Sequence, residues 1–186
     1  IALGYSPEDA ADYTVAACWE YIPSKCGADF PNIETFDFPK IISDVIHEKL
    51  ESCRAMADLL EYVKKAIHKE CDYLMAEPEE RPWLFRPNIM ISLFVDGCIE
   101  TLTDFFHGGA KYMNFGCHGA GISTAADSLA AVKKVIFDDK SLTKTELLEA
   151  LNSNFEGRED IRNLLLSCSK MGSNDDYVDN LAEFIM

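Results

Sequence analysis

The sequence lacks a surplus of positive charge, because 17 lysines and arginines are outnumbered by 32 aspartates and glutamates and the formal net charge is −15. A nucleic-acid partner needs a basic face on the protein, and anionic membranes attract basic segments. The composition therefore argues against a nucleic-acid partner and against a membrane surface. The sequence also lacks an apolar run long enough to cross a bilayer and a signal-peptide pattern at its start.

The sequence has no Cys-x-x-Cys pair, although it contains seven cysteines. Zinc and iron–sulfur sites are commonly built from such pairs, so we expect no metal site within this chain. Cysteines spread evenly along a chain fit a reducing cytosol, where most thiols act as small buried apolar groups. We therefore predict a cytoplasmic protein, and a disulfide framework is the weaker interpretation. The cysteines are Cys18, Cys26, Cys53, Cys71, Cys98, Cys117 and Cys168.

What is present is typical of a globular protein. The 186 residues are 48% hydrophobic and 26% charged, which is enough for one domain with a sizeable core. The chain begins at Ile1 and ends at Met186 on an apolar helical stripe. We interpret these ends as those of a piece of a larger protein.

Apolar residues at helical spacing predict a mostly helical chain. They indicate one long helix over residues 39–76, or two helices broken near residues 51–52, and a further helix over residues 87–106. Short strands are expected over residues 13–17 and around residues 114–118.

Three capping patterns predict where helices begin. Ser6 followed by proline and two acids indicates the start of a short helix. The spacing of Thr124 and Asp127 is that of a capping box, and Thr143 and Glu146 repeat it.

Cys18, Trp19 and Glu20 follow the strand predicted over residues 13–17. Residues two apart on an extended segment point to the same side of the backbone. The thiol of Cys18 and the carboxylate of Glu20 are therefore expected to share one side.

Four stretches of the sequence resemble motifs of one enzyme family and occur in the family's order. Residues 8–20 contain Glu-Asp-Ala, Asp-Tyr and Cys-x-Glu, and residues 92–112 contain Asp-Gly-Cys-Ile-Glu and Gly-Gly-Ala-Lys-Tyr. Residues 121–134 contain Ala-Asp-Ser-Leu-Ala-Ala-Val-Lys-Lys, and residues 170–179 contain Asn-Asp-Asp-Tyr-Val-Asp. The set resembles the glycyl radical enzymes, the pyruvate formate-lyase-like family. One motif would be a weak signal, but four in order span most of the chain.

The resemblance implies an α/β fold, a ten-stranded barrel made from two half-barrels wrapped by helices. Residues 1–186 would be part of a single catalytic domain, mostly helical, from the C-terminal part of the barrel, with a cysteine loop at 16–38. The family's glycine loop carries a stable backbone radical and contains an Arg-Val-x-Gly-Tyr run, which is absent here. We therefore expect no cofactor bound in this chain, and no activity from these residues alone.

The resemblance also implies a mechanism. Cys18 matches the cysteine whose thiyl radical takes hydrogen from a substrate carbon, and Glu20 matches the acid that handles a substrate hydroxyl proton. The glycyl radical would lie elsewhere in the complete protein, installed by a separate radical S-adenosylmethionine enzyme. The expected partners are this activating enzyme and a small hydroxylated substrate that loses a neighbouring group, and a homodimer is left open.

Departures from the family pattern leave alternatives. Ala17 stands where pyruvate formate-lyase itself has a second cysteine, which disfavours formate acetyltransferase activity. Trp19 and Tyr21 add aromatic bulk next to the site and leave an arylacetate-type decarboxylase open. The non-enzymatic alternative is a degenerate helical module without radical activity.

Three further residues are candidates for substrate binding. His118 lies on the segment that resembles a barrel strand, where a structural role is equally expected. Asp29 and Asn32 follow the cysteine loop's start, where family members place substrate contacts, and the alternative for both is a polar surface turn.

Overall fold

The computed structural model describes residues 4–15, 20–74 and 86–186, and for residues 28–33, 74 and 115 it describes the backbone alone. The chain divides into two compact units. Unit 1 comprises residues 1–35 and 75–118, and unit 2 comprises residues 36–74 and 119–186. Within the described residues, no helix combines the length and apolarity needed to cross a membrane.

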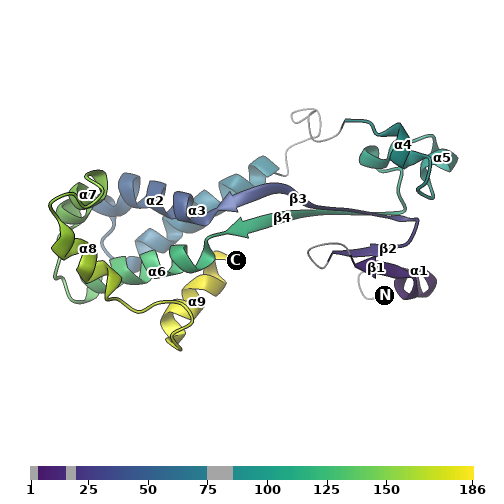
Figure 1. Cartoon of the computed structure of the whole chain (residues 1–186). Helices are drawn as coiled ribbons and strands as arrows, with labels where there is room; N and C mark the ends of the chain where they lie inside the picture. The colour runs from purple at the N-terminus through teal and green to yellow at the C-terminus, as the bar shows by residue number, and fades with distance from the viewer. Residues whose placement is uncertain (1–3, 16–19, 75–85) are drawn as a thin grey trace. The chain divides into compact units, whose positions relative to one another are not determined.

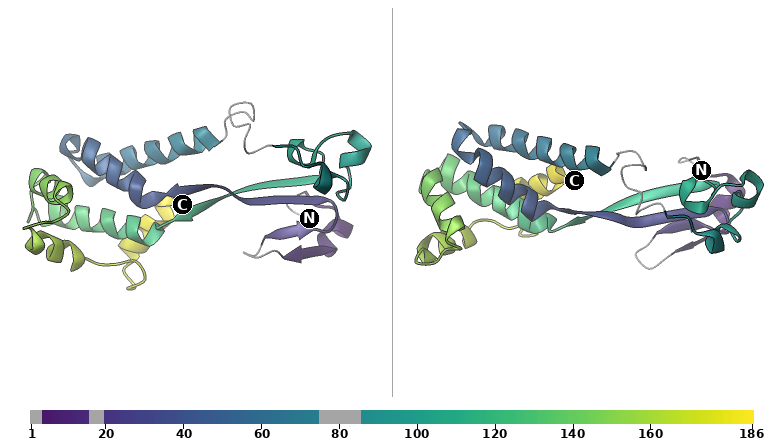
Figure 2. Two further views of the ribbon diagram at one scale, coloured as in Figure 1. Left: turned by 45° about the horizontal axis from the view of Figure 1, so that its top comes forward. Right: turned by 90° about the horizontal axis from the view of Figure 1, so that it is seen from above.

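Unit 2 is a bundle of helices. Helix α2 packs against both α3 and α6, and α6 packs against α9 (Figure 1). Both views of Figure 2 show α2 and α3 beside each other. The elements are α2 (Phe38–Lys49), the 3₁₀ helix η1 (Leu50–Ser52), α3 (Met56–Leu74), α6 (Ile122–Val132), the π-helical segment η4 (Lys133–Asp138), α7 (Lys144–Asn152), α8 (Glu159–Leu166) and α9 (Asp176–Ile185).

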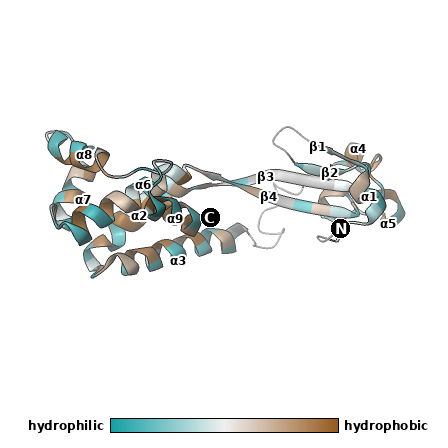
Figure 3. Ribbon diagram, turned by 90° about the horizontal axis from the view of Figure 1, so that it is seen from below, coloured by the Kyte–Doolittle hydropathy of each residue, from teal (hydrophilic) through white to brown (hydrophobic). Residues whose placement is uncertain are grey.

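The helices of unit 2 enclose one hydrophobic core. Each helix carries hydrophobic and hydrophilic residues in alternating bands along its length, as Figure 3 shows by hydropathy. Such banding places one stripe of each helix in the core and leaves the rest to solvent. Side chains that are at most 2% exposed include Ile42, Leu59, Leu129, Leu147 and Ile185.

Replacing Leu129 by alanine is expected to lower the free energy of unfolding of unit 2 by about 2–5 kcal/mol, because it leaves a cavity in a close-packed core. Leu129 is 0% exposed in the middle of α6, which contacts both α2 and α9. Urea unfolding followed by helical circular dichroism measures the change. Leu166→Ala is the matched control, because Leu166 is 54% exposed and its loss should change stability by no more than about 0.5 kcal/mol. Equal effects of the two substitutions would contradict this core assignment.

Strands β3 (Gly27–Asp37) and β4 (Tyr112–Ala120) form a two-stranded sheet. Their arrows point the same way in Figure 1, so the pair is parallel, and β3 leads into α2 as β4 leads into α6. Gly119 marks a close approach where the strands end, since a Cβ atom there would lie 2.5 Å from the ring of Phe38. Parallel strands joined through helices are the arrangement of an α/β fold, as predicted.

Unit 1 consists of short elements. Helix α1 (Pro7–Ala11) precedes a hairpin of β1 (Tyr13–Val15) and β2 (Tyr21–Pro23). The remaining elements are α4 (Ile89–Ser92), α5 (Cys98–Thr101) and the 3₁₀ helix η3 (Phe105–His107). Among its described residues, the buried apolar cluster comprises only Cys98, Phe105 and Ala110.

Several helix predictions are confirmed. The break expected at residues 51–52 falls in η1, between α2 and α3. Ser6 caps α1, and Thr143 and Glu146 form a capping box at the start of α7. The strands expected near residues 13–17 and 114–118 correspond to β1 and β4.

The capping box predicted at Thr124 and Asp127 is wrong. Helix α6 begins earlier, at Ile122, so both residues lie inside it. Asp127 instead accepts a hydrogen bond from the backbone N–H of Met171 at 2.7 Å, which links α6 to the segment before α9.

The helix predicted over residues 87–106 is also wrong. The structure has three short helical pieces there, α4, α5 and η3. Gly97 has φ of 103° and Leu102 has φ of 52°, and residues in this left-handed region interrupt an α-helix. The apolar side chains of this segment that lie on the surface are Ile89, Met90, Ile91, Leu93, Phe94, Ile99 and Leu102.

The segment predicted as a cysteine loop at 16–38 contains two strands. It includes β2 and all of β3 before α2 begins at Phe38. The backbone of Asp29 and Asn32 therefore belongs to a strand and not to a polar surface turn. That residues 1–186 lie in a single catalytic domain stays a prediction.

Candidate active site

The candidate site is built on the hairpin of β1 and β2. The strands are antiparallel, with Val15 opposite Tyr21 and Tyr13 opposite Pro23. At the open end, the N–H of Ser24 donates to the carbonyl of Asp12 at 2.9 Å. The connection between the two strands consists of residues 16–20, and it is the segment that carries the Cys-x-Glu motif.

Glu20 is the one residue of this connection that the structure describes. It directly precedes β2 and is half-buried. Cys18 and Trp19 lie outside the described residues, so the geometry that brings the thiol beside the carboxylate stays a prediction. The structure does define how the two strands that flank them are held.

Asp9 is the centre of a polar cluster beside this hairpin. Its Oδ2 accepts hydrogen bonds from Ser6 Oγ at 2.8 Å, from Lys111 Nζ at 2.5 Å and from Tyr112 Oη at 2.8 Å. These bonds hold the pKa of the Asp9 carboxyl far below its usual range. Burial, reinforced by the charge of Asp9 and a hydrogen bond to it, raises the pKa of the Cys26 thiol. Asp9 is therefore a fixed anion, and Cys26 is a neutral thiol.

Tyrosine rings pack against the hairpin next to the Asp9 cluster. The ring centroid of Tyr21 lies 4.7 Å from that of Tyr13 and 5.3 Å from that of Tyr5, and Tyr5 lies 4.7 Å from Tyr112. Tyr21 Oη donates to the carbonyl of Ala10 at 2.8 Å. Such ring pairs contribute about 0.5–1.5 kcal/mol each beyond the area that they bury. The Tyr21 side chain is thus part of the support of the hairpin.

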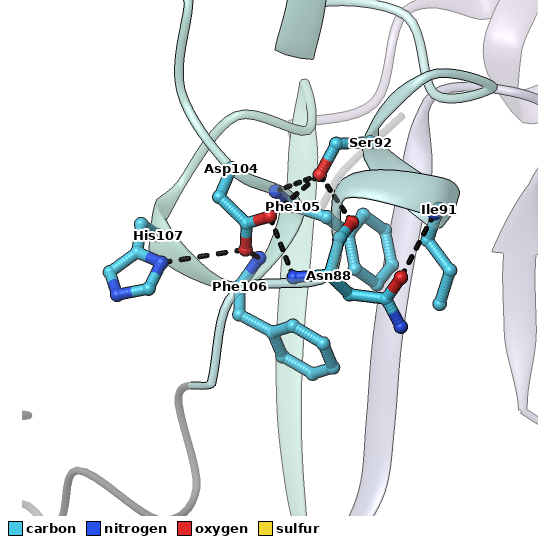
Figure 4. Close-up of polar contacts among 7 residues, drawn as sticks. All are labelled: Asn88, Ile91, Ser92, Asp104, Phe105, Phe106 and His107. Atoms are coloured by element: carbon cyan, nitrogen blue, oxygen red, sulfur yellow. Dashed lines mark hydrogen bonds and ion pairs between the residues drawn. The ribbon is translucent and has the colours of Figure 1, made fainter.

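A second polar cluster fixes the segment of α4 and η3 (Figure 4). The Asp104 carboxylate accepts hydrogen bonds from the N–H of Asn88 and Ser92 Oγ, both at 2.8 Å, and from the N–H of Phe106 at 2.9 Å. His107 Nδ1 lies 3.4 Å from it. Burial opposes ionisation of Asp104, but the hydrogen bonds outweigh it and lower the pKa of the carboxyl.

Replacing Asp104 by alanine is expected to increase amide hydrogen exchange at Asn88 and Phe106, because their donors lose a charged acceptor worth about 1.5–3 kcal/mol each. A carboxyl with a lowered pKa stabilises the fold fully above its usual pKa of 3.8, and the contribution is lost as the pH falls through the folded value. The two amide resonances should therefore shift in acid, with a midpoint below 3.8. Identical titration in the alanine variant would contradict this role.

The three predicted substrate-binding residues lie on the two parallel strands. His118 is on β4, and its side chain is exposed. Asp29 and Asn32 are on β3, and their side chains lie outside the described residues. A role for any of the three in substrate binding stays a prediction.

The sequence predicted that most cysteines are buried packing thiols and that this chain holds no metal site. Cys26, Cys53, Cys98 and Cys168 are buried, as predicted for packing thiols, whereas Cys117 is exposed. In the part of the chain that the structure describes, no group of three His, Cys, Asp or Glu side chains is arranged to hold a metal ion.

The fold and the Cys-x-Glu connection define a class of protein, and comparison with known proteins identifies it. The family model described as pyruvate formate lyase-like matches residues 1–186. The chain belongs to this family of glycyl radical enzymes, and the resemblance stated from its motifs is confirmed.

Two curated relatives are similar to parts of this chain. Trans-4-hydroxy-L-proline dehydratase of Clostridioides difficile is 39% identical over 132 residues, which cover 69% of this chain and 17% of that protein. Isethionate sulfite-lyase of Nitratidesulfovibrio vulgaris is 52% identical over 75 residues, which cover 40% of this chain and 8% of that protein.

A solved structure is similar to nearly the whole chain. The hydroxyproline dehydratase of Clostridioides difficile, with its substrate trans-4-hydroxy-L-proline bound, matches with a TM-score of 0.84 and 29% identity. The match covers 98% of this chain and 25% of that one. The chain therefore has the fold of one part of a glycyl radical enzyme barrel, and it spans about a quarter or less of the relatives that it matches.

Sequence reasoning missed the contact between Asp9 and the pair Lys111 and Tyr112. All three belong to the recognised motifs, in residues 8–20 and 92–112. The signal was therefore present, but a motif does not tell which of its residues meet when about 100 positions separate them.

Proposed function

We propose that this chain is part of a glycyl radical enzyme of the dehydratase or lyase type. The observation that carries the proposal is that this chain belongs to the family and has a hairpin of β1 and β2 whose connection contains the Cys-x-Glu motif. The names of the two relatives describe the removal of water and of sulfite. We infer the same kind of elimination here, on a small substrate with a hydroxyl group next to the carbon that bears the leaving group.

Cys18 is the hydrogen-abstracting residue in this proposal. A glycyl radical in a part of the complete protein outside these residues, installed by a separate radical S-adenosylmethionine enzyme, would take the hydrogen atom of the Cys18 thiol. The S–H bond would break, a C–H bond would form on the glycine, and a thiyl radical would be left on Cys18. The thiyl sulfur of Cys18 takes a hydrogen atom from the hydroxyl-bearing carbon, so an S–H bond forms and a C–H bond breaks. The two bonds are similar in strength, and the transfer is close to reversible.

Glu20 is the acid–base residue. Its carboxylate takes the hydroxyl proton, which converts the carbon radical to a ketyl. The ketyl expels the group on the neighbouring carbon with its bonding electron pair, and the proton held by Glu20 neutralises that group. The product radical then takes hydrogen back from the Cys18 thiol. The sum is a redox-neutral elimination that consumes no further reactant.

The cellular setting follows from this chemistry. The partners are the small substrate and the activating enzyme, and a closed, reducing, oxygen-free site is needed to preserve the radical. These requirements fit an anaerobic cytoplasm, and we infer that these residues without the rest of the enzyme are inactive.

Of the two aromatic residues near the motif, Tyr21 gives little support to a decarboxylase. Tyr21 was interpreted as bulk that shapes the substrate site. Its ring packs on Tyr5 and Tyr13, and its hydroxyl is bonded to Ala10. These contacts give the Tyr21 side chain a structural role in holding the hairpin.

Anaerobic activation of the complete protein, followed by electron paramagnetic resonance and assay on a panel of diols and other hydroxylated compounds, tests the proposal. A glycyl radical signal together with elimination from at least one compound is expected. A fully activated protein that turns over arylacetates and no hydroxylated compound would overturn it.

A further inference from the structure

The Asp9 cluster joins two parts of unit 1 that are far apart in the sequence. Asp9 lies in the first turn of α1, whereas Lys111 directly precedes β4 and Tyr112 begins it. Ser6 caps α1 through its Oγ, which accepts from the Asp9 N–H at 3.1 Å, and Tyr112 Oη accepts from the Ser6 N–H at 3.0 Å. Through Asp9 and Ser6, Lys111 and Tyr112 therefore fix the start of α1 to the start of β4.

Both strands of the hairpin are tied to this cluster. On one side, α1 continues through Asp12 into β1, and its Ala10 carbonyl accepts from Tyr21 Oη. On the other side, the carbonyl of Cys26, just beyond β2, accepts from the Tyr112 N–H at 3.1 Å. Lys111 and Tyr112 thus connect to α1 and β1 through Asp9, and Tyr112 also connects to the end of β2 through Cys26.

The hairpin buries few apolar side chains. Pro23 is the buried residue of β2, but helix α1 has no buried residue and all three residues of β1 are exposed. The side chain of Asp9, by contrast, is only 22% exposed and is bonded to three donors. Charge-assisted hydrogen bonds are directional and set orientation more sharply than apolar contact does. The position of the hairpin in unit 1 therefore depends on polar and aromatic contacts.

We propose that Asp9, acting with Lys111 and Tyr112, is a positioning residue that sets where the hairpin presents Cys18 and Glu20 to the substrate. The inference rests on the proposed function, because it presumes that these two residues react. A misplacement of reacting atoms by about 1 Å can slow a reaction about 100-fold without changing its chemical groups. The described side-chain contacts of Asp9 include those with Ser6, Lys111 and Tyr112, so in this proposal it acts through the strands on either side of the connection.

The test uses the complete protein, activated anaerobically, with the substrate that the panel identifies. Asp9→Asn removes the charge but keeps an acceptor, and we expect kcat to fall about 10- to 100-fold with KM changed less than about twofold. The glycyl radical signal should keep its amplitude. The isotope effect on kcat from deuterium at the abstracted position should rise, because hydrogen transfer becomes slower than the other steps.

Matched variants separate positioning from folding. Asp44→Asn removes an equally short 2.5 Å ion pair with Lys40 on the surface of α2, and it should leave kcat and the isotope effect unchanged. Lys111→Met leaves the capping of α1 by Ser6 intact and should reproduce the effect of Asp9→Asn. The double variant should be no slower than the worse single one, since both act on one contact.

The outcomes distinguish this inference from the proposed function. Wild-type kcat and isotope effect in both Asp9→Asn and Lys111→Met would overturn the positioning role. So would a loss of kcat in both variants that only matches a loss of folded protein or of radical signal. If Cys18→Ala is inactive while these variants are fully active, the positioning role alone fails. If Cys18→Ala keeps full activity, the proposed function fails and the positioning role fails with it.

Discussion

Replacing Cys18 by alanine is expected to abolish turnover by the complete, activated protein. Alanine has only strong C–H bonds in its side chain and cannot form a sulfur radical, so the C–H bond of the substrate stays intact. Loss of a residue that reacts covalently lowers kcat by factors on the order of 10⁴ or more. Steady-state kinetics on an anaerobically activated sample measures the loss, and electron paramagnetic resonance measures the radical in the same sample.

The control for this substitution is the radical itself. The glycyl radical is expected on a glycine outside these residues, so Cys18→Ala should accumulate it in normal amount and hold it without turnover. Cys117→Ala serves as the matched variant, because Cys117 is an exposed cysteine in β4 to which the mechanism gives no role. Full turnover by Cys18→Ala with every active substrate would show that another residue abstracts hydrogen.

Replacing Glu20 by glutamine is expected to lower kcat by about 10²- to 10⁴-fold, the usual contribution of a general acid or base. Glutamine has nearly the same shape and cannot accept the hydroxyl proton, so the ketyl does not form. Hydrogen abstraction by Cys18 is untouched, and exchange of deuterium between substrate and thiol should continue without elimination. Mass spectrometry of recovered substrate detects that exchange.

Glu48→Gln is the matched control for the glutamate. Glu48 lies on α2 with its side chain 68% exposed and pairs only loosely with Lys49 at 3.6 Å. We expect it to keep the wild-type rate. If Glu20→Gln also kept the wild-type rate, the proton would have another acceptor and the role given to Glu20 would be lost.

Local rules predicted several helix starts and the strands β1 and β4, but they did not predict the strand β3. The residues around Ser6, Thr143 and Glu146 signal helix starts through contacts within one turn, and the sequence alone defines these contacts. Strand β3 contains Pro31, Asp29 and Asn32, residue types that are depleted in strands. It is formed because it pairs with β4, which lies far along the chain, and no local rule reports such a pairing.

The error over residues 87–106 has a different cause. The apolar spacing of that segment is helical, and a single glycine such as Gly97 is only a small disadvantage within a helix. In the structure Gly97 and Leu102 take left-handed backbone angles, and the Asp104 cluster draws the chain back onto Asn88 and Ser92. A few specific hydrogen bonds thus override a weak intrinsic preference.

The candidate site was predicted in part. The Cys-x-Glu connection and the strand before it follow from sequence, and the family membership is confirmed. The support of the hairpin by Asp9, Lys111 and Tyr112 could not be predicted, since it is a tertiary contact between two motifs.

The fate of deuterium placed on the hydroxyl-bearing carbon of the substrate tests the central claim most directly. If Cys18 abstracts hydrogen there, the label leaves that carbon, turnover shows a primary isotope effect, and the label appears on the neighbouring carbon of the product or in solvent through the thiol. Product that keeps all of the label on its original carbon would contradict the account, because that C–H bond would never have broken.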